Sequence, residues 1–321
     1  VGPGQVLAGA AVFILAQVGY TVGMSLYDAY LTRIAAPENV GRVSGFGWAV
    51  GFAGGIAAVL LCMALLQGAD VVHDRSYTVA FGAIAVLFAI AAAPAIIGLR
   101  RIPEGTRDAD AAPVHSAAAR VLESIRSWRG RGNILRFLAA IYLINDAVVT
   151  VGFFAGIYFR EHFGLGLAEL LQLILLYHVL AAPATLAFGH LCDRISAHAA
   201  IYITLAIWIA AVLLMAFGTG PYVPAAVVAL FATVLGSTQA LLRGAYAVVV
   251  PRARAAEYFG FNAFASRLSA AAGPLAYGLV SAATGSQQIA LLSVLVFLLA
   301  GAIVLATVRL QEPSGGTESA A

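Results

Sequence analysis

Nine long apolar segments follow one another along the chain, with short polar connections between them. They cover residues 6–32, 43–66, 77–99, 134–159, 167–191, 198–217, 223–250, 258–281 and 287–308. Each reaches the length of about 20 residues that an α-helix needs to cross a hydrocarbon core of roughly 30 Å. The apolar positions are continuous and do not alternate as they would in a membrane β-barrel. The pattern therefore predicts an all-α, polytopic membrane bundle of about nine transmembrane helices.

The composition supports this interpretation and excludes a soluble protein. Apolar residues make up 62% of the chain and charged residues 10%, and the mean hydropathy is +0.93. A soluble protein carries about a quarter charged residues. The pI of 9.0 does not indicate nucleic-acid binding, because the basic residues gather in short connections between spans. We expect an integral protein of a bacterial cytoplasmic membrane, with the lipid bilayer as its surroundings and no nucleic-acid partner.

The arginines predict the orientation of the spans. All 18 basic residues are arginine. Fourteen of them belong to the connections around 33–42, 100–136, 192–197 and 251–257 or to the C-terminal end, whereas the opposite connections hold only Arg75 and Arg160. Because arginine-rich connections stay in the cytoplasm, this asymmetry places the first set on the cytoplasmic side.

One long polar stretch divides the chain. We expect a partial N-terminal helical half at residues 1–99, a cytoplasmic linker at 100–133, a six-helix C-terminal half at 134–310 and a cytoplasmic tail at 311–321. Part of the linker, residues 117–128, fits an amphipathic helix on the anionic inner leaflet. A solvated linker whose arginines enforce the topology explains the same composition.

Two parts of the chain resemble each other. Residues 37–42 form a charged turn that opens with proline and leads into a Gly-Phe-Gly sequence at 45–47. Residues 251–254 form a similar turn, and Gly-Phe-Asn follows at 260–262. Parallel repeats of this kind occur in transporters. The first and seventh spans are then equivalent in a plan of six plus six helices, and we expect three helices to precede Val1.

Several separated motifs carry a family resemblance. They are Tyr27-Asp28-Ala29-Tyr30-Leu31, residues 41–51, Asn145-Asp146, residues 236–243, residues 257–261, Arg267 and Gly273-Pro274. With these motifs the chain resembles the vacuole effluxer-like branch of the major facilitator superfamily, although Asp28 stands where that branch usually has asparagine. The resemblance implies a major facilitator fold and secondary transport of a small solute by alternating access, with amino-acid efflux as the activity of the branch. It also implies a gating loop at residues 189–194, which contains Asp193 and Arg194.

Polar residues inside spans are the candidates for binding and coupling. A charge in a span costs about 2.5–3.5 kcal/mol on insertion scales, so each one invites a functional explanation. Asp146 is a candidate for proton coupling or for a substrate ammonium group. Asn145 beside it and Thr150 one turn away are further candidates for substrate contact or proton coupling. Arg267 could bind a carboxylate through its guanidinium group, and Gln239 is a further candidate for substrate contact. The alternative for Asp146 is a fixed ion pair with Arg267 or Arg243.

A second set of charged residues lies at or near span ends, where a gate would close. Asp28, Arg42 and Arg243 fit an ion pair on the cytoplasmic side, with Asp28 bound to one of the two arginines. A purely structural ion pair explains the same residues.

No motif indicates an enzyme. The sequence contains no phosphate-binding loop, no nucleophile elbow and no zinc-protease helix motif, and Cys62 and Cys192 stand far apart. We therefore expect no cofactor and no metal, and a monomer that carries a small molecule, coupled to protons. A non-transporting membrane sensor or scaffold with the same fold is the alternative, and a membrane-embedded enzyme is a weaker one.

Overall fold

The computed structural model describes residues 6–65, 75–99 and 132–310, and these residues are helical apart from short connections. The α-helices are α1 (Val6–Ile34), α2 (Val40–Leu65), α3 (Arg75–Leu99), α5 (Gly132–Phe163), α6 (Leu167–Arg194), α7 (Ala197–Phe217), α8 (Val223–Val249), α9 (Ala255–Thr284) and α10 (Gln287–Ala306). The all-α prediction is confirmed, and each predicted span corresponds to one of these helices. The amphipathic helix considered at 117–128 and the predicted tail at 311–321 lie outside the described residues.

Eight of the described helices are long and apolar enough to cross a membrane. The exception is α9, which occupies the position of the predicted span 258–281 but falls short of the others in apolar composition. Glu257, Asn262 and Arg267 all lie on it. It nevertheless packs against α1, α5 and α10, so it belongs to the helical assembly like the others.

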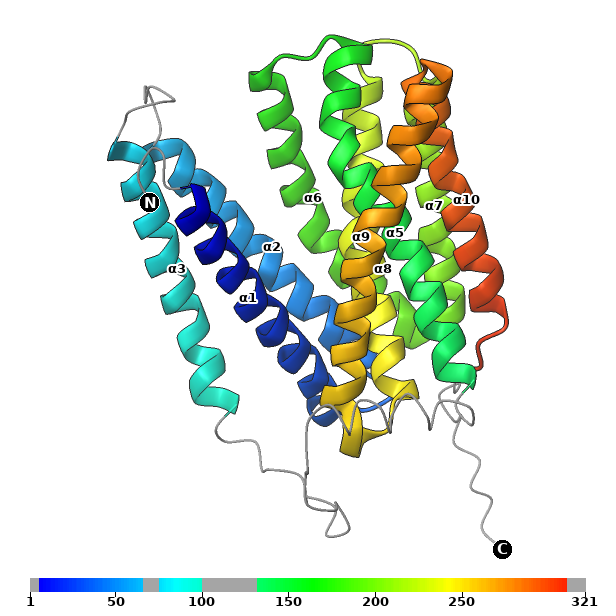
Figure 1. Ribbon diagram of the computed structural model, residues 1–321. Helices are drawn as coiled ribbons and strands as arrows, with labels where there is room; N and C mark the ends of the chain where they lie inside the picture. Colours follow the sequence, from blue (N-terminus) through cyan, green and yellow to red (C-terminus); the bar gives the residue numbers. More distant parts are fainter. Residues whose placement is uncertain (1–5, 66–74, 100–131, 311–321) are drawn as a thin grey trace, which may run out of the picture.

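The helices form two groups (Figure 1). Helices α5 to α10 make a bundle, and α1 to α3 lean against it at an angle. Between the groups, α2 packs on α6 and α8, and α1 packs on α9 and α8. The groups approach each other at the end that carries the α1–α2, α6–α7 and α8–α9 connections, and they diverge toward the other end. We call the first of these the Arg-rich end, because the sequence places the arginines there.

Buried aromatic side chains hold the six-helix bundle together. Trp208 of α7 donates a hydrogen bond from Nε1 to Thr238 Oγ1 of α8 at 3.1 Å. Tyr246 of α8 donates from its hydroxyl group to the Tyr258 carbonyl oxygen of α9 at 3.0 Å. The polar atom of a buried tryptophan or tyrosine usually finds a hydrogen-bond partner. These rings therefore fix the neighbouring helices by packing and by hydrogen bonding together.

The outer surface of α1 and α3 is apolar. Phe13 is 65% exposed, Phe81 76% and Phe88 71%. A membrane helix satisfies its own backbone hydrogen bonds. Apolar side chains on its outer face then leave no polar group exposed to lipid. These side chains agree with a protein that lies in a bilayer.

The predicted orientation can be tested with single cysteines on a background in which Cys62 and Cys192 are replaced by alanine. We expect an impermeant maleimide to label Tyr222→Cys from outside intact cells, because Tyr222 is 84% exposed at the end opposite the Arg-rich end. Glu38→Cys, in the exposed α1–α2 connection, should react only after the membrane is permeabilised. Labelling of Glu38→Cys in intact cells would contradict the orientation.

Candidate functional site

A cavity of about 440 Å³ lies between α1 and α2 on one side and α5, α8 and α9 on the other. Small-molecule sites typically span about 300–1,000 Å³. The polar residues that line it are Tyr20, Thr21, Ser25, Asp28, Trp48, Asn145, Gln239, Arg243, Asn262, Ser266 and Arg267. Both helix groups contribute to the wall, so any change in their relative position changes the cavity.

Asn145 and Gln239 form a neutral hydrogen-bonded link across the cavity wall. The Gln239 side chain on α8 donates from Nε2 to Asn145 Oδ1 on α5 at 2.6 Å. Asn145 in turn donates from Nδ2 to Ser266 Oγ on α9 at 3.4 Å. The structure thus brings both predicted contact residues to the cavity, with uncharged groups that bind one another.

Arg267 of α9 lies at the wall of the same cavity. Its Nη2 donates to Thr21 Oγ1 of α1 at 3.1 Å, and its guanidinium carbon lies 5.7 Å from the centre of the Tyr20 ring. The side chain is exposed, and none of the ion pairs among the described residues includes it. It also borders an apolar groove along α1. Its positive charge is therefore offset by neutral groups alone.

Asp146 and Thr150 do not line the cavity. Asp146 is fully buried and Thr150 is 1% exposed. Asp146 Oδ1 accepts a hydrogen bond of 2.7 Å from the backbone N–H of Gly273 on α9, whereas Asp146 Oδ2 has no partner among the described residues. Neither arginine that was considered as a partner for Asp146 forms an ion pair with it. Its carboxylate faces the α9 backbone next to Pro274, because adjacent residues of a helix point in different directions and Asn145 takes the cavity face.

Arg243 closes the floor of the cavity by linking three helices. Its Nη1 lies 3.0 Å from Asp28 Oδ1 of α1, and its Nε and Nη2 donate to the hydroxyl and carbonyl oxygens of Ser44 on α2 at 3.0 and 2.9 Å. The Arg243 and Asp28 side chains are 9% and 19% exposed. The Tyr27 ring centre lies 5.2 Å from the guanidinium carbon. The charges of this pair compensate each other at the junction of the two helix groups.

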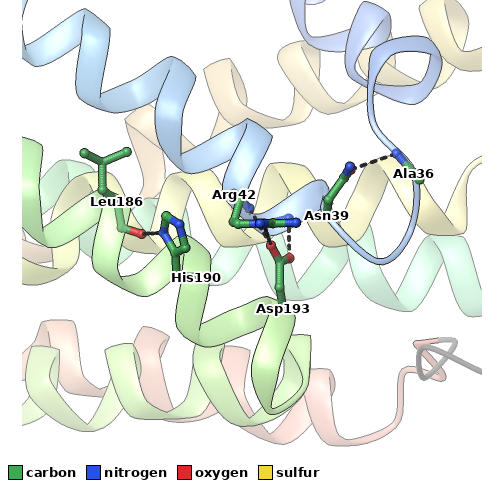
Figure 2. A network of polar contacts seen from close by, with 7 residues as sticks. Ala36, Asn39, Arg42, Leu186, His190 and Asp193 are labelled. Carbon is green, nitrogen blue, oxygen red and sulfur yellow. Dashed lines mark hydrogen bonds and ion pairs between the residues drawn. The ribbon is translucent and has the colours of Figure 1, made fainter. Parts of the chain in front are cut away.

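Asp193 makes a second contact between the groups, at the Arg-rich end (Figure 2). Its carboxylate on α6 accepts hydrogen bonds from the backbone N–H groups of Gly41 and Arg42 at 2.9 and 3.0 Å. It also pairs with Arg42 Nε at 3.1 Å. The two N–H groups belong to the first turn of α2, where free donors and the helix dipole favour an anion. Asp193 thus ties the start of α2 to the end of α6.

Local hydrogen bonds shape the elements around Asp193. Asn39 Oδ1 accepts from the backbone N–H of Ala36 at 2.9 Å and so closes the turn between α1 and α2. His190 Nδ1 hydrogen-bonds to the Leu186 carbonyl oxygen of its own helix at 2.8 Å. Arg194, predicted as a gate residue beside Asp193, is exposed and belongs to none of the ion pairs among the described residues.

Three glycines allow the backbones of α2 and α6 to touch, and we call Gly41, Gly45 and Gly189 the glycine contact. A Cβ atom on Gly189 would lie 2.6 Å from the Gly41 carbonyl oxygen, and one on Gly45 would lie 2.8 Å from the Thr185 carbonyl oxygen. Such distances are too short for a side chain of any kind. Small residues four apart commonly permit close helix approach in membranes.

Sequence reasoning assigned no role to several groups that the structure places at the site. Ser44 binds Arg243, and Thr21 binds Arg267. Two further lining residues have buried polar atoms without a partner among the described residues, namely Trp48 Nε1 and Asn262 Oδ1. A small polar or aromatic residue in a span gives little signal, because such residues are also common at helix contacts.

Known proteins provide three comparisons. The family described as "Vacuole effluxer Atg22 like" matches residues 1–315. The "Uncharacterized MFS-type transporter YxiO" of Bacillus subtilis (strain 168) is 23% identical over 301 residues, which are 92% of this chain and 70% of that protein. A crystal structure of a bacterial homologue of the iron transporter ferroportin in the outward-facing state is 15% identical, with 95% of this chain and 91% of that chain covered and a TM-score of 0.48.

The Asp28–Arg243 pair predicts a strong coupling in stability. Arg243→Gln should lower the free energy of unfolding by about 3–5 kcal/mol, because it leaves the Asp28 charge without compensation. The double variant Asp28→Asn/Arg243→Gln should lose less than the sum of the two single variants, with a coupling of about 1–3 kcal/mol. Unfolding in mixed micelles, followed by circular dichroism, measures both quantities.

Arg252→Gln is the matched control, since Arg252 is exposed at the same end of the molecule. It should change the stability by about 0.5 kcal/mol or less. Additive losses for Asp28 and Arg243 would show that the pair contributes no coupling.

Proposed function

The chain belongs to the vacuole effluxer Atg22-like family, and on that basis we propose that it is a secondary active transporter that moves a small organic solute across the membrane by alternating access. The name of the Bacillus subtilis relative, an MFS-type transporter, supports the same mechanism. The solute is an amino acid or another small organic molecule, and the direction is efflux, as the family description suggests. The protein works as a monomer.

The cavity between the two helix groups is the observation that carries this proposal. It is lined by α1 and α2 from one group and by α5, α8 and α9 from the other. A site at such an interface changes its access when the groups rock against each other, which is the working principle of transporters built from repeated halves.

Closure at the Arg-rich end supports an assignment of the conformational state. There the Asp193 carboxylate holds the start of α2, and the Arg243–Asp28 pair holds α1 and α2 below the cavity. With the Arg-rich end in the cytoplasm, the described conformation is closed to the cytoplasm. Opening toward the cytoplasm requires that the Asp193 hydrogen bonds, the Arg243 links and the glycine contact all separate.

Asp146 is the proposed proton-coupling residue, although it does not touch the cavity. Its Oδ1 atom binds the Gly273 N–H of α9, and its Oδ2 atom is buried without a partner among the described residues. A charged carboxylate is a stronger hydrogen-bond acceptor than a protonated one. Adding a proton therefore weakens the tie to Gly273, which lies on the same helix as Arg267, and changes how α9 borders the cavity.

Transport in liposomes tests the function and the role of Asp146 together. Purified protein should accumulate labelled amino acids or related organic solutes when a pH gradient is imposed. Asp146→Asn should abolish accumulation and retain exchange of solute across the membrane, because the amide still accepts from Gly273 but cannot take up a proton.

Thr150→Val is the matched control, since Thr150 Oγ1 donates to the Asp146 carbonyl oxygen and its removal eliminates no ionisable group. It should keep accumulation within about three-fold of the wild type, the effect of a net loss of one neutral hydrogen bond. Accumulation by Asp146→Asn at the wild-type level would refute the coupling role. A folded wild type that neither accumulates nor exchanges any such solute would refute transport and favour a sensor or scaffold.

A further inference from the structure

The charges around the cavity do not cancel. Three of the described lining residues are charged, namely Asp28, Arg243 and Arg267. Asp28 and Arg243 neutralise each other at 3.0 Å. The wall therefore keeps one positive charge, on Arg267. The Arg267 side chain is exposed, and a charge that no acid compensates within the apolar surroundings of a membrane protein favours a ligand of opposite sign.

The surroundings of Arg267 leave it able to bind such a ligand. Among the described residues, its side chain donates a hydrogen bond to Thr21 Oγ1, and a guanidinium group offers five N–H donors. The centre of the Tyr20 ring lies 5.7 Å from the guanidinium carbon, and an aromatic ring does not neutralise the charge. A planar fork of donors matches a carboxylate, which can accept two parallel hydrogen bonds.

Two buried atoms of the lining residues need complementary partners. Trp48 Nε1 is a donor and Asn262 Oδ1 is an acceptor, and neither has a partner among the described residues. Buried polar atoms in proteins are nearly always hydrogen-bonded. A carboxylate supplies acceptors only. Asn262 Oδ1 has almost no accessible surface, so a ligand in the cavity reaches it only when the Asn262 side chain turns toward the cavity. A ligand that then binds this oxygen must carry an O–H or N–H donor.

The same set of charges disfavours a ligand that carries an ammonium group. The only acid in the described cavity wall is Asp28, which is already bound to Arg243. Gln239 and Asn145 use their facing polar atoms on each other at 2.6 Å. Once the carboxylate of an amino acid has neutralised Arg267, its ammonium group would find only neutral oxygens as partners in the described wall.

From these observations we propose that the cavity selects organic carboxylates with a single net negative charge and a neutral hydrogen-bond donor, such as hydroxy acids, over zwitterionic amino acids. The carboxylate binds Arg267, and the donor binds Asn262. This inference rests on the proposed transport function and narrows its substrate class.

Four probes with the same isobutyl chain separate the contributions, and the chain can lie on the apolar groove beside Arg267. They are α-hydroxyisocaproate, isocaproate without the hydroxyl group, zwitterionic leucine and cationic leucinamide. Calorimetric titration of the wild-type protein in nanodiscs should give about ten-fold tighter binding of α-hydroxyisocaproate than of either isocaproate or leucine, the effect expected for one good hydrogen bond or one uncompensated charge. Leucinamide should not bind.

Variants assign the two contacts. Arg267→Gln should weaken the binding of α-hydroxyisocaproate about ten-fold or more, since it removes a charge-assisted contact. Arg267→Lys should retain part of the affinity. Asn262→Ala should weaken the binding of α-hydroxyisocaproate and leave the affinity for isocaproate unchanged. General damage to the fold would not produce this pattern. Ser293→Ala is the control and should leave all four affinities unchanged, because Ser293 lies on α10 outside the cavity lining and its hydroxyl group donates to the Ala290 carbonyl oxygen.

Leucine binding as tight as α-hydroxyisocaproate, or an affinity that Arg267→Gln leaves unchanged, would overturn the inference. Binding of none of the four probes by folded protein would overturn it as well. Gradient-driven transport distinguishes this failure from failure of the function. Accumulation of leucine with no preference for the anion would refute the proposed substrate class but support the transport function. Selective anion binding without any transport would support the proposed site but refute the transport function.

Discussion

The backbone contact between α2 and α6 is the constraint on which the rest of the arrangement depends. A Cβ atom on Gly41 would lie 2.7 Å from the Gly189 carbonyl oxygen and 2.6 Å from Asp193 Oδ1. Because no side chain separates the two helices there, the Asp193 carboxylate can reach the N–H groups of Gly41 and Arg42. The same approach brings Ser44 into reach of Arg243 and of the Ala240 carbonyl oxygen. Closure at the Arg-rich end and the floor of the cavity thus follow from one contact.

Charged groups inside the bundle fall into two kinds. Asp28, Arg243 and Asp193 each bind groups on a helix of the other group, so they stabilise one relative position of the two groups. Asp146 and Arg267 form no ion pair among the described residues, and each binds a neutral group on a neighbouring helix. Keeping such charges in a membrane is costly, and the cost is understandable if a proton and a solute bind there during transport. The proposed division of roles therefore follows from which charges the protein itself compensates.

The sequence predicted the helices well because a bilayer allows few alternatives. Long apolar segments must become helices, and the predicted spans differ from α5 and α6 only by a few residues at their ends. Asn145 and Gln239 were expected at the site because polar residues in spans are rare, and the structure places both on the cavity wall. It could not be predicted that Asp146 faces Gly273 instead, since two adjacent residues of a helix are equally good candidates until the neighbouring helices are known. Which glycines of α2 touch a neighbouring helix could not be predicted either, for the same reason. A Cβ atom on Gly51 would meet nothing within 4 Å, whereas one on Gly47 would lie 2.6 Å from the Tyr27 hydroxyl oxygen, and the backbone contact with α6 uses Gly41 and Gly45.

Distances between spin labels test most directly the central claim, that the glycine contact holds the Arg-rich end closed and separates when the two helix groups rock. Labels at Glu38 and Ile195 report on the Arg-rich end, and labels at Leu60 and Gln172 report on the opposite end; all four positions are exposed. The account predicts one short distance between Glu38 and Ile195 in the wild type. In Gly189→Ala it predicts a second population with a longer Glu38–Ile195 distance and a shorter distance between Leu60 and Gln172. Gly51→Ala should change neither distance. Unchanged distances at both ends in Gly189→Ala would contradict it.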